Sequence, residues 1–233
     1  MRQARPDIAS GMNVSTAQPT PDELIGRPPP SAFKWKWNYT RACAQLPETL
    51  LPIEIWNGTL VMAPIPFFLH QDIIARVFRV LDQWVRRRRL GIVILSPMDV
   101  VFKEDLVLQP DVMFIAKDRT HIIQRHVMGA PDLAVEVVSG GRRKRDYKDK
   151  RERYEEHGVK EYWIVTPWPS LVEVLLLEGG RYVVHKVYDK DDTLRSPTFP
   201  ELQVTLKDVF DFPLEPGEEP PIVREPPAPA YRA

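Results

Sequence analysis

The chain has 233 residues and a formal net charge of zero, with 32 Lys and Arg against 32 Asp and Glu. This length is enough to bury one sizeable core, and the zero net charge excludes a global basic field of the kind that attracts nucleic acid. The one cysteine, Cys43, excludes an internal disulfide framework and fits a reducing compartment.

Proline-rich segments stand at both ends of the chain. Residues 18–32 and 213–233 hold many of the 24 prolines and few large apolar side chains, so they bury too little to offset the entropy lost on ordering. We therefore expect a flexible tail over residues 1–32, one folded domain over 33–213 and a second flexible tail over 214–233. The first residues lack the apolar core of a signal peptide, and no stretch is long and apolar enough for a membrane span, so the cytoplasm is the expected location.

The first half of the predicted domain combines helices with a hairpin. Residues 37–48 have the pattern of a short helix. Residues 53–62 form two extended runs joined at Asn57-Gly58, a pair that tolerates the positive φ angles of a tight hairpin turn. Between Phe68 and Arg89, apolar residues recur with the spacing of an amphipathic helix.

The second half alternates strands with one long helix. The pattern predicts strands over 91–102, 107–116 and 131–139, followed by a charged helix over 143–157. The domain is completed by a strand over 161–167, a hairpin over 171–188, and an extended piece with a helical turn over 198–210. This order predicts an α/β (α+β) fold with a mixed β-sheet flanked by helices.

The strand over 131–139 carries a carboxylate, Glu136, among Leu, Ala and Val. Because side chains alternate along a strand, Leu133 and Val135 share an apolar face, and Glu136 lies on the other face, where the next helix can cover it. A buried carboxylate without a partner costs several kcal/mol or takes up a proton. Glu136 therefore needs a partner, and this strand alone does not favour a metal ion over a salt bridge to an arginine.

A second acid, Asp111, follows Pro110 and opens the apolar run 112–116 in the same way. Two acids on neighbouring strands repel each other unless a cation lies between them. Carboxylate oxygens suit Mg²⁺ or Mn²⁺, which bind a few carboxylates together with waters. Asp111 and Glu136 together therefore predict a site for Mg²⁺, with Mn²⁺ as the other candidate ion.

The charged helix that follows Glu136 directs a lysine toward the same place. Its large apolar groups, Tyr147 and Tyr154, are seven residues apart and mark the buried stripe, and Lys150 lies between them. A lysine in a charged helix is usually solvated. Beside two acids, however, it fits phosphodiester hydrolysis, in which a metal ion activates water and an ammonium group orients it or offsets charge on the phosphorane.

The chain resembles the Uma-type family of restriction endonucleases, a branch of the PD-(D/E)XK nuclease superfamily, over about residues 38–210. The resemblance is carried by three segments: QPDVMF (109–114), GAPDLAVEVVS (129–139) and RDYKDKRERYEEHGVKEYWIVTP (145–167). It implies a restriction-endonuclease-like fold and Mg²⁺-dependent hydrolysis of DNA. It is also compatible with a homodimer, since members of the superfamily often pair two sites to cut two strands.

The resemblance also assigns site residues. The family's hairpin acid falls on Glu54, its metal-binding aspartate on Asp111 and its second acid on Glu136. The superfamily's usual lysine, two residues after the second acid, is replaced here by Val138. In this family that lysine stands on the next helix, which gives Lys150, the residue that the tyrosine spacing also indicates. The implied catalytic set is Glu54, Asp111, Glu136 and Lys150, and the implied metal ligands are Asp111, Glu136 and Glu54.

Basic residues near the acidic strand are candidates for binding DNA. Arg142, Arg143, Lys144 and Arg145 follow the strand directly, and there we favour contacts to backbone phosphates over simple solvation. His70, near the start of the long helix, matches a histidine of the family. It can contact a phosphate or the edge of the site, or it can serve only to cap or pack the helix.

Three functions are compatible with these residues. The first is a metal-dependent DNA endonuclease, and the second is a non-catalytic nucleic-acid-binding or assembly protein that keeps the nuclease fold. The third is a metal-dependent hydrolase of a small phosphate ester. Retention of all four residues of the implied catalytic set favours an enzyme, because a binding module has no need to bury like charges.

Overall fold

The computed structural model describes residues 36–46, 53–62, 68–138 and 145–212. The tails predicted over 1–32 and 214–233 lie outside these ranges. None of the described helices combines the length and the apolar character needed to cross a membrane.

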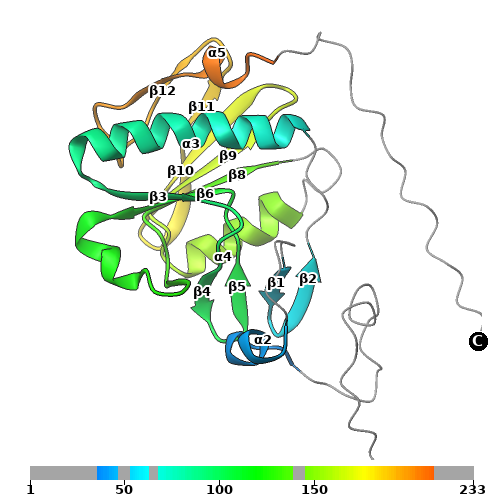
Figure 1. Cartoon of the computed structure of the whole chain (residues 1–233). Helices are drawn as coiled ribbons and strands as arrows, with labels where there is room; N and C mark the ends of the chain where they lie inside the picture. The colour runs from blue at the N-terminus through cyan, green and yellow to red at the C-terminus, as the bar shows by residue number, and fades with distance from the viewer. Residues whose placement is uncertain (1–35, 47–52, 63–67, 139–144, 213–233) are drawn as a thin grey trace, which may run out of the picture.

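The main sheet has six strands in the order β11-β10-β9-β8-β6-β3 (Figure 1). Neighbouring strands run antiparallel except β8 and β9, which are parallel, so the predicted mixed sheet is confirmed. Parallel neighbours need a crossover, which here contains the π-helix η2 (Arg145–Lys150) and the α-helix α4 (Arg151–Glu156). The strands are β3 (Gly91–Leu95), β6 (Val112–Ala116), β8 (Leu133–Val137), β9 (Glu161–Thr166), β10 (Leu171–Glu178) and β11 (Arg181–Asp189).

A second sheet has five strands in the order β2-β1-β5-β4-β7. Its hairpin turns at Asn57 and Gly58, whose φ angles of 49° and 83° are the positive values that the Asn-Gly pair predicts. The short helix α2 (Tyr39–Gln45) packs against this sheet through Tyr39 and Ala42. The strands are β1 (Ile53–Trp56), β2 (Thr59–Met62), β4 (Val100–Lys103), β5 (Leu106–Leu108) and β7 (Val127–Met128).

Four short elements complete the described chain. The 3-10 helix η1 (Lys117–Ile122) follows β6. Near the C-terminal end, β12 (Thr193–Arg195) pairs with β13 (Gln203–Thr205), and α5 (Leu206–Val209) follows directly.

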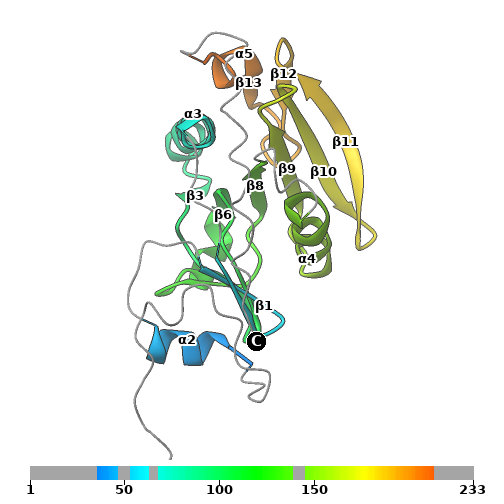
Figure 2. The same cartoon turned by 90° about the vertical axis from the view of Figure 1, so that its right-hand side faces the viewer.

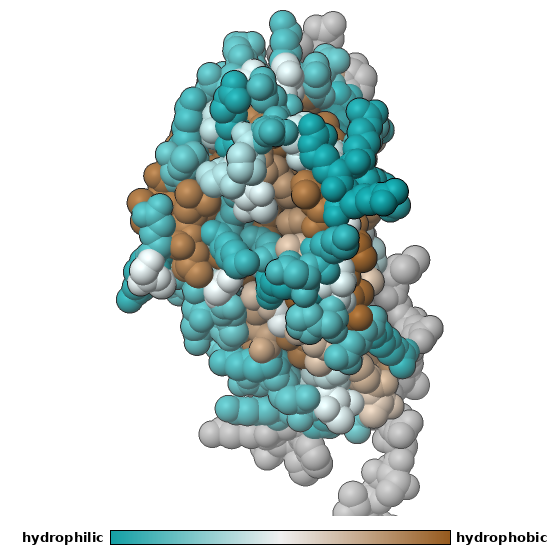
Figure 3. Space-filling view, turned by 90° about the vertical axis from the view of Figure 1, so that its left-hand side faces the viewer, coloured by the Kyte–Doolittle hydropathy of each residue, from teal (hydrophilic) through white to brown (hydrophobic). Residues whose placement is uncertain are grey.

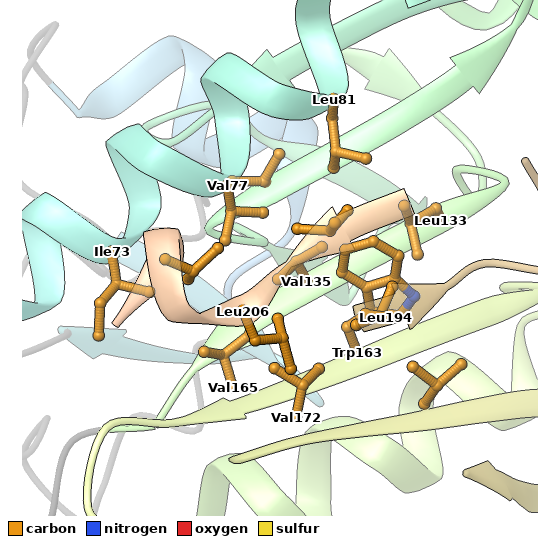
Figure 4. Close-up of a cluster of buried hydrophobic side chains, with 14 of the residues drawn as sticks. Ile73, Val77, Leu81, Leu133, Val135, Trp163, Val165, Val172, Leu194 and Leu206 are labelled. Carbon is orange, nitrogen blue, oxygen red and sulfur yellow. The ribbon is translucent and has the colours of Figure 1, made fainter. Parts of the chain in front are cut away.

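Helices cover both faces of the main sheet (Figure 2). The amphipathic helix α3 (Phe68–Arg88) covers one face, where Leu81, Leu133 and Trp163 are among the buried side chains (Figure 4). On the opposite face, Tyr154 of α4 packs in a cluster that includes Ala134. Strand β8 is therefore buried on both faces, and a carboxylate on this strand is removed from water.

Two predicted strands are wrong in extent, because prolines divide them. The run 91–102 is β3 and β4, which separate at Ser96-Pro97 and belong to different sheets. The run 107–116 is likewise β5 and β6, with Gln109 and Pro110 between them. Proline lacks the N–H that a ladder inside a sheet requires. The chain consequently passes from the second sheet to the main sheet just before Asp111.

Apolar side chains reach the surface at both edges of the main sheet. Exposed valines lie on β11 at positions 183, 184 and 187, and Ile92 and Leu95 are exposed on β3. Figure 3 shows one face of the molecule, on which apolar patches lie among mostly hydrophilic residues. The acid-bearing strand β8 lies in the interior of the sheet, away from both edges.

Candidate active site

Asp111 and Glu136 lie level with each other on neighbouring strands. Strands β6 and β8 pair antiparallel with Val112 opposite Val135, so the residue before Val112 is level with the residue after Val135. The Val137 N–H donates a hydrogen bond of 2.7 Å to Oδ2 of Asp111 and ties the two strands together at this point. Two of the three predicted metal ligands, Asp111 and Glu136, therefore come from adjacent positions in the sheet.

Lys150 points from the crossover helix into the sheet. Its Nζ lies 2.9 and 3.0 Å from the two carboxylate oxygens of Glu136 and 3.1 Å from Oε1 of Glu54. These three side chains have exposed fractions of 8% or less. Lys148, two residues earlier, is exposed. The direction of Lys150 therefore agrees with the sequence prediction, although the side chain of Tyr147 lies outside the described part of the chain.

Tyr154 contacts the same carboxylate from the next turn of the helix. Residues four apart lie on one face of a helix, and the Tyr154 hydroxyl donates a hydrogen bond of 2.6 Å to Oε1 of Glu136. The tyrosine spacing predicts a packing role for Tyr154, and packing is confirmed by its full burial. The spacing does not predict its hydrogen bond to Glu136, because spacing alone does not show which acceptor the hydroxyl group meets.

Glu54 is held in place by two neighbours that the sequence pattern did not indicate. Its Oε2 accepts a hydrogen bond from Trp56 Nε1 at 2.9 Å, and its Oε1 accepts one from the Gln109 N–H, also at 2.9 Å. The carbonyl oxygen of Gln109 in turn lies 3.5 Å from Lys150 Nζ. Trp56 could have been found from its position, because residues two apart share one face of a strand. For Gln109, the only sequence signal is its position directly before Pro110.

The electrostatics of Glu136 differ from those of another buried acid on the same strand segment. Burial raises the pKa of Glu136 well above its ordinary value, Lys150 acts in the opposite direction, and the charges of Asp111 and Glu54 raise the pKa further. Burial also raises the pKa of Asp132, but hydrogen bonds from a lysine, a backbone N–H and an arginine lower it overall. A buried acid held close to other acids is the arrangement more typical of a functional site.

The residues predicted to bind DNA are only partly within the described chain. His70 lies at the edge of the site, with Nε2 at 3.5 Å from Oδ2 of Asp111. Arg142, Arg143 and Lys144 lie outside the described residues. Arg145 begins η2, but its side chain also lies outside them.

The donor set fits a small hard cation held by two carboxylates. Across the ranges that the structure describes, no three His, Cys, Asp or Glu side chains are grouped so that they could hold a metal ion. The contacts of Glu54 with Lys150 favour a role in positioning the lysine over direct ligation. Asp111 and Glu136 match the one or two carboxylates through which proteins usually hold a hydrated Mg²⁺. A cation there also relieves the repulsion that helps to raise the pKa of Glu136.

Comparisons with known proteins confirm the family resemblance and agree with the fold. The model of the Uma2 family, described as "Putative restriction endonuclease", matches residues 40–207. A solved structure from Anabaena variabilis ATCC 29413, described as "a putative nuclease belonging to DUF820", is similar with a TM-score of 0.62 and 23% sequence identity. The similarity covers 72% of this chain and 95% of that one. A comparison with curated proteins gave no match.

Proposed function

The chain belongs to the Uma2 family, and from the geometry of its site we propose that it is a Mg²⁺-dependent endonuclease that hydrolyses phosphodiester bonds in DNA. The observation that carries this proposal is the position of Lys150, which reaches Glu136 from the crossover helix while Asp111 lies level with Glu136 on the next strand. Two acids and one ammonium group held close together are the groups that metal-assisted phosphoryl chemistry needs.

Asp111 and Glu136 are the residues we assign to hold Mg²⁺, or Mn²⁺ in its place. The ion, when bound, lowers the pKa of a water molecule and neutralises charge on the phosphate. Val137 keeps Asp111 in position through its N–H, and Lys150 does the same for Glu136. The protein's own contribution is thus to keep two carboxylates fixed and close together.

Lys150 supplies the positive charge that the scissile phosphate requires. Its three hydrogen atoms can serve three acceptors, and the described neighbours include both oxygens of Glu136 and one oxygen of Glu54. When a phosphate enters, the ammonium group can exchange one of these contacts for the attacking water or for a phosphate oxygen. The positive charge of Lys150 at this position stabilises the transition state, in a site that already excludes bulk water.

Glu54 acts on this reaction through the lysine. Its carboxylate is fixed by Trp56 and by the Gln109 N–H, so it offers Lys150 a rigid partner. The remaining proposed residues concern the substrate: Arg142, Arg143, Lys144 and Arg145 for backbone phosphates, and His70 for a phosphate next to Asp111. A homodimer is a further prediction, which sedimentation velocity would check.

The alternative is a non-catalytic protein that binds nucleic acid or organises an assembly. Burial of Glu54, Glu136 and Lys150 argues against it. Charges that are removed from water lower the stability of the fold, so their presence in the interior favours a function that needs them. A hydrolase of a small phosphate ester uses the same chemistry and is distinguished only by the substrate.

The decisive experiment is incubation of the purified protein with plasmid DNA and with single-stranded DNA, in Mg²⁺, in Mn²⁺ and in excess chelator. We expect cleavage in either metal and none in chelator, and no cleavage by the Glu136→Gln variant, which controls for contaminating nucleases. Binding of DNA without cleavage would support the non-catalytic alternative. Turnover of a nitrophenyl phosphate ester without cleavage of either DNA would support the small-ester hydrolase.

A further inference from the structure

The Tyr154 hydroxyl is a buried polar group that the proposed chemistry leaves without a role. The side chain is fully buried, and its ring meets Tyr162 edge to face at 5.1 Å and lies 5.9 Å from the ring of Phe102. An aromatic residue that only filled this space could be a phenylalanine. The hydroxyl instead makes a hydrogen bond of 2.6 Å to Oε1 of Glu136.

The two oxygens of Glu136 therefore differ in their surroundings. Of the hydrogen bonds between described residues, Oε1 accepts one from Tyr154 and one from Lys150, whereas Oε2 accepts one, from Lys150. A carboxylate oxygen offers about two lone-pair directions. With respect to the described residues, Oε1 is then saturated, and Oε2 keeps one direction open.

The direction of the Tyr154 hydroxyl is set by rigid parts of the fold. Lys150 is the N-cap of α4 and Tyr154 lies one turn later, so their three hydrogen bonds to Glu136 come from a single helix face. The same helix is attached to β11, where the Tyr182 N–H donates to Glu155 at 2.6 Å. Rotation of the Glu136 carboxylate thus requires the loss of the Tyr154 hydrogen bond or a movement of the helix.

We propose that Tyr154 is a positioning residue that saturates Oε1 of Glu136 and so presents Oε2 of this carboxylate to the divalent cation. This inference rests on the proposed function, in which Glu136 is a metal ligand. Residues that orient a metal ligand from behind usually change metal affinity by about 10- to 100-fold when they are replaced. Tyr154 is expected to belong to this class, with a larger effect on metal binding than on folding.

The test compares Tyr154→Phe with Tyr182→Phe. Tyr182 belongs to the same buried cluster, and its hydroxyl donates one hydrogen bond of 2.8 Å to the Val159 carbonyl oxygen, away from Glu136. Each variant removes one buried hydroxyl and keeps the ring. Mn²⁺ affinity is measured by isothermal titration calorimetry, the melting temperature by circular dichroism, and kcat and KM with plasmid DNA.

We expect Tyr154→Phe to weaken Mn²⁺ binding by about tenfold or more and to lower kcat while KM for DNA stays unchanged. Tyr182→Phe should lower the melting temperature to a similar extent and leave Mn²⁺ affinity unchanged. The inference is overturned if Tyr154→Phe binds Mn²⁺ like the wild type, or if both variants lose Mn²⁺ affinity equally.

The outcomes also separate this inference from the proposed function. Wild-type protein that binds no Mn²⁺ overturns both. Loss of Mn²⁺ binding in Glu136→Gln but not in Tyr154→Phe overturns only the role of Tyr154. Weaker Mn²⁺ binding by Tyr154→Phe in a protein that cuts no DNA supports the role of Tyr154 and refutes the nuclease.

Discussion

Replacement of Lys150 by alanine removes the one described ammonium group that lies between Glu54 and Glu136. The Nζ atom of Lys150 lies within 3.1 Å of an oxygen of each acid, so neither acid keeps this partner in the variant. Both carboxylates stay buried, because the backbone of α4 and the ring of Tyr154 are unchanged. The variant therefore tests catalysis and stability together, and the two effects need separate measurements.

The magnitude for catalysis follows from the charge that is removed. Loss of one well-placed donor to a transition state lowers kcat by about 10²-fold or more, which corresponds to about 2.7 kcal/mol. For stability, removal of one partner of a buried ion pair costs about 3–5 kcal/mol. Since burial already raises the pKa of Glu136, this carboxyl can take up a proton in the variant. We therefore expect the lower end of that range, about 3 kcal/mol.

The assay is the initial rate of plasmid cleavage in Mg²⁺, at a temperature where circular dichroism shows the variant to be folded, together with a filter-binding measurement of DNA affinity. Cleavage should fall by about 10²-fold or more while DNA binding stays nearly intact. Lys148→Ala is the matched control, because Lys148 is exposed on the same helix, and it should be close to neutral. Arg151→Ala reports on packing, since Arg151 donates to the Tyr182 carbonyl oxygen at 3.3 Å.

Two results would refute this reasoning. If Lys148→Ala abolishes cleavage and Lys150→Ala does not, the assignment of Lys150 as the lysine that faces the site is wrong. If neither replacement matters in a protein that does cut DNA, the lysine has no part in the reaction.

Three further predictions address the metal site and the basic segment. Glu136→Gln should abolish cleavage through lost metal affinity, so calorimetry should detect no Mn²⁺ binding, and wild-type affinity in this variant would contradict the assignment. Because burial raises the pKa of Glu136 above its ordinary value of 4.5, this group's contribution to stability is fully present below pH 4.5 and is lost as the pH rises through the folded-state pKa. Mg²⁺ favours the ionised carboxylate, so the rise in melting temperature on adding millimolar Mg²⁺ should grow over the same pH interval, and a rise that shrinks with pH would contradict the role of Glu136. Replacement of Arg142, Arg143, Lys144 and Arg145 by alanine should weaken DNA binding across sequences and flatten the log–log salt dependence by about one unit for each phosphate that is no longer bound; an unchanged slope would mean that these residues are only solvated.

Local pattern was sufficient to predict several elements and one face of the site. The Asn-Gly pair indicated the β1–β2 hairpin, because few residue pairs adopt two successive positive φ angles. The spacing of apolar residues indicated α3, and strand alternation placed Glu136 opposite the face that α3 covers. The tyrosine spacing also directed Lys150 at the sheet. Each of these depends on geometry that repeats within a few residues, which is why periodicity alone can reveal it.

The partners of each site residue, in contrast, were decided only by the tertiary structure. The apolar runs 91–102 and 107–116 read as continuous strands, yet packing assigns their two halves to different sheets. The contact of Glu54 with Lys150 joins residues that are far apart in the sequence, and Gln109 connects both through its backbone. Periodicity states which side of an element is buried. It does not state which distant group meets that side, because this depends on how the sheets and helices pack around one another, and the pKa of Glu136 and the direction of the Tyr154 hydroxyl depend on the same packing.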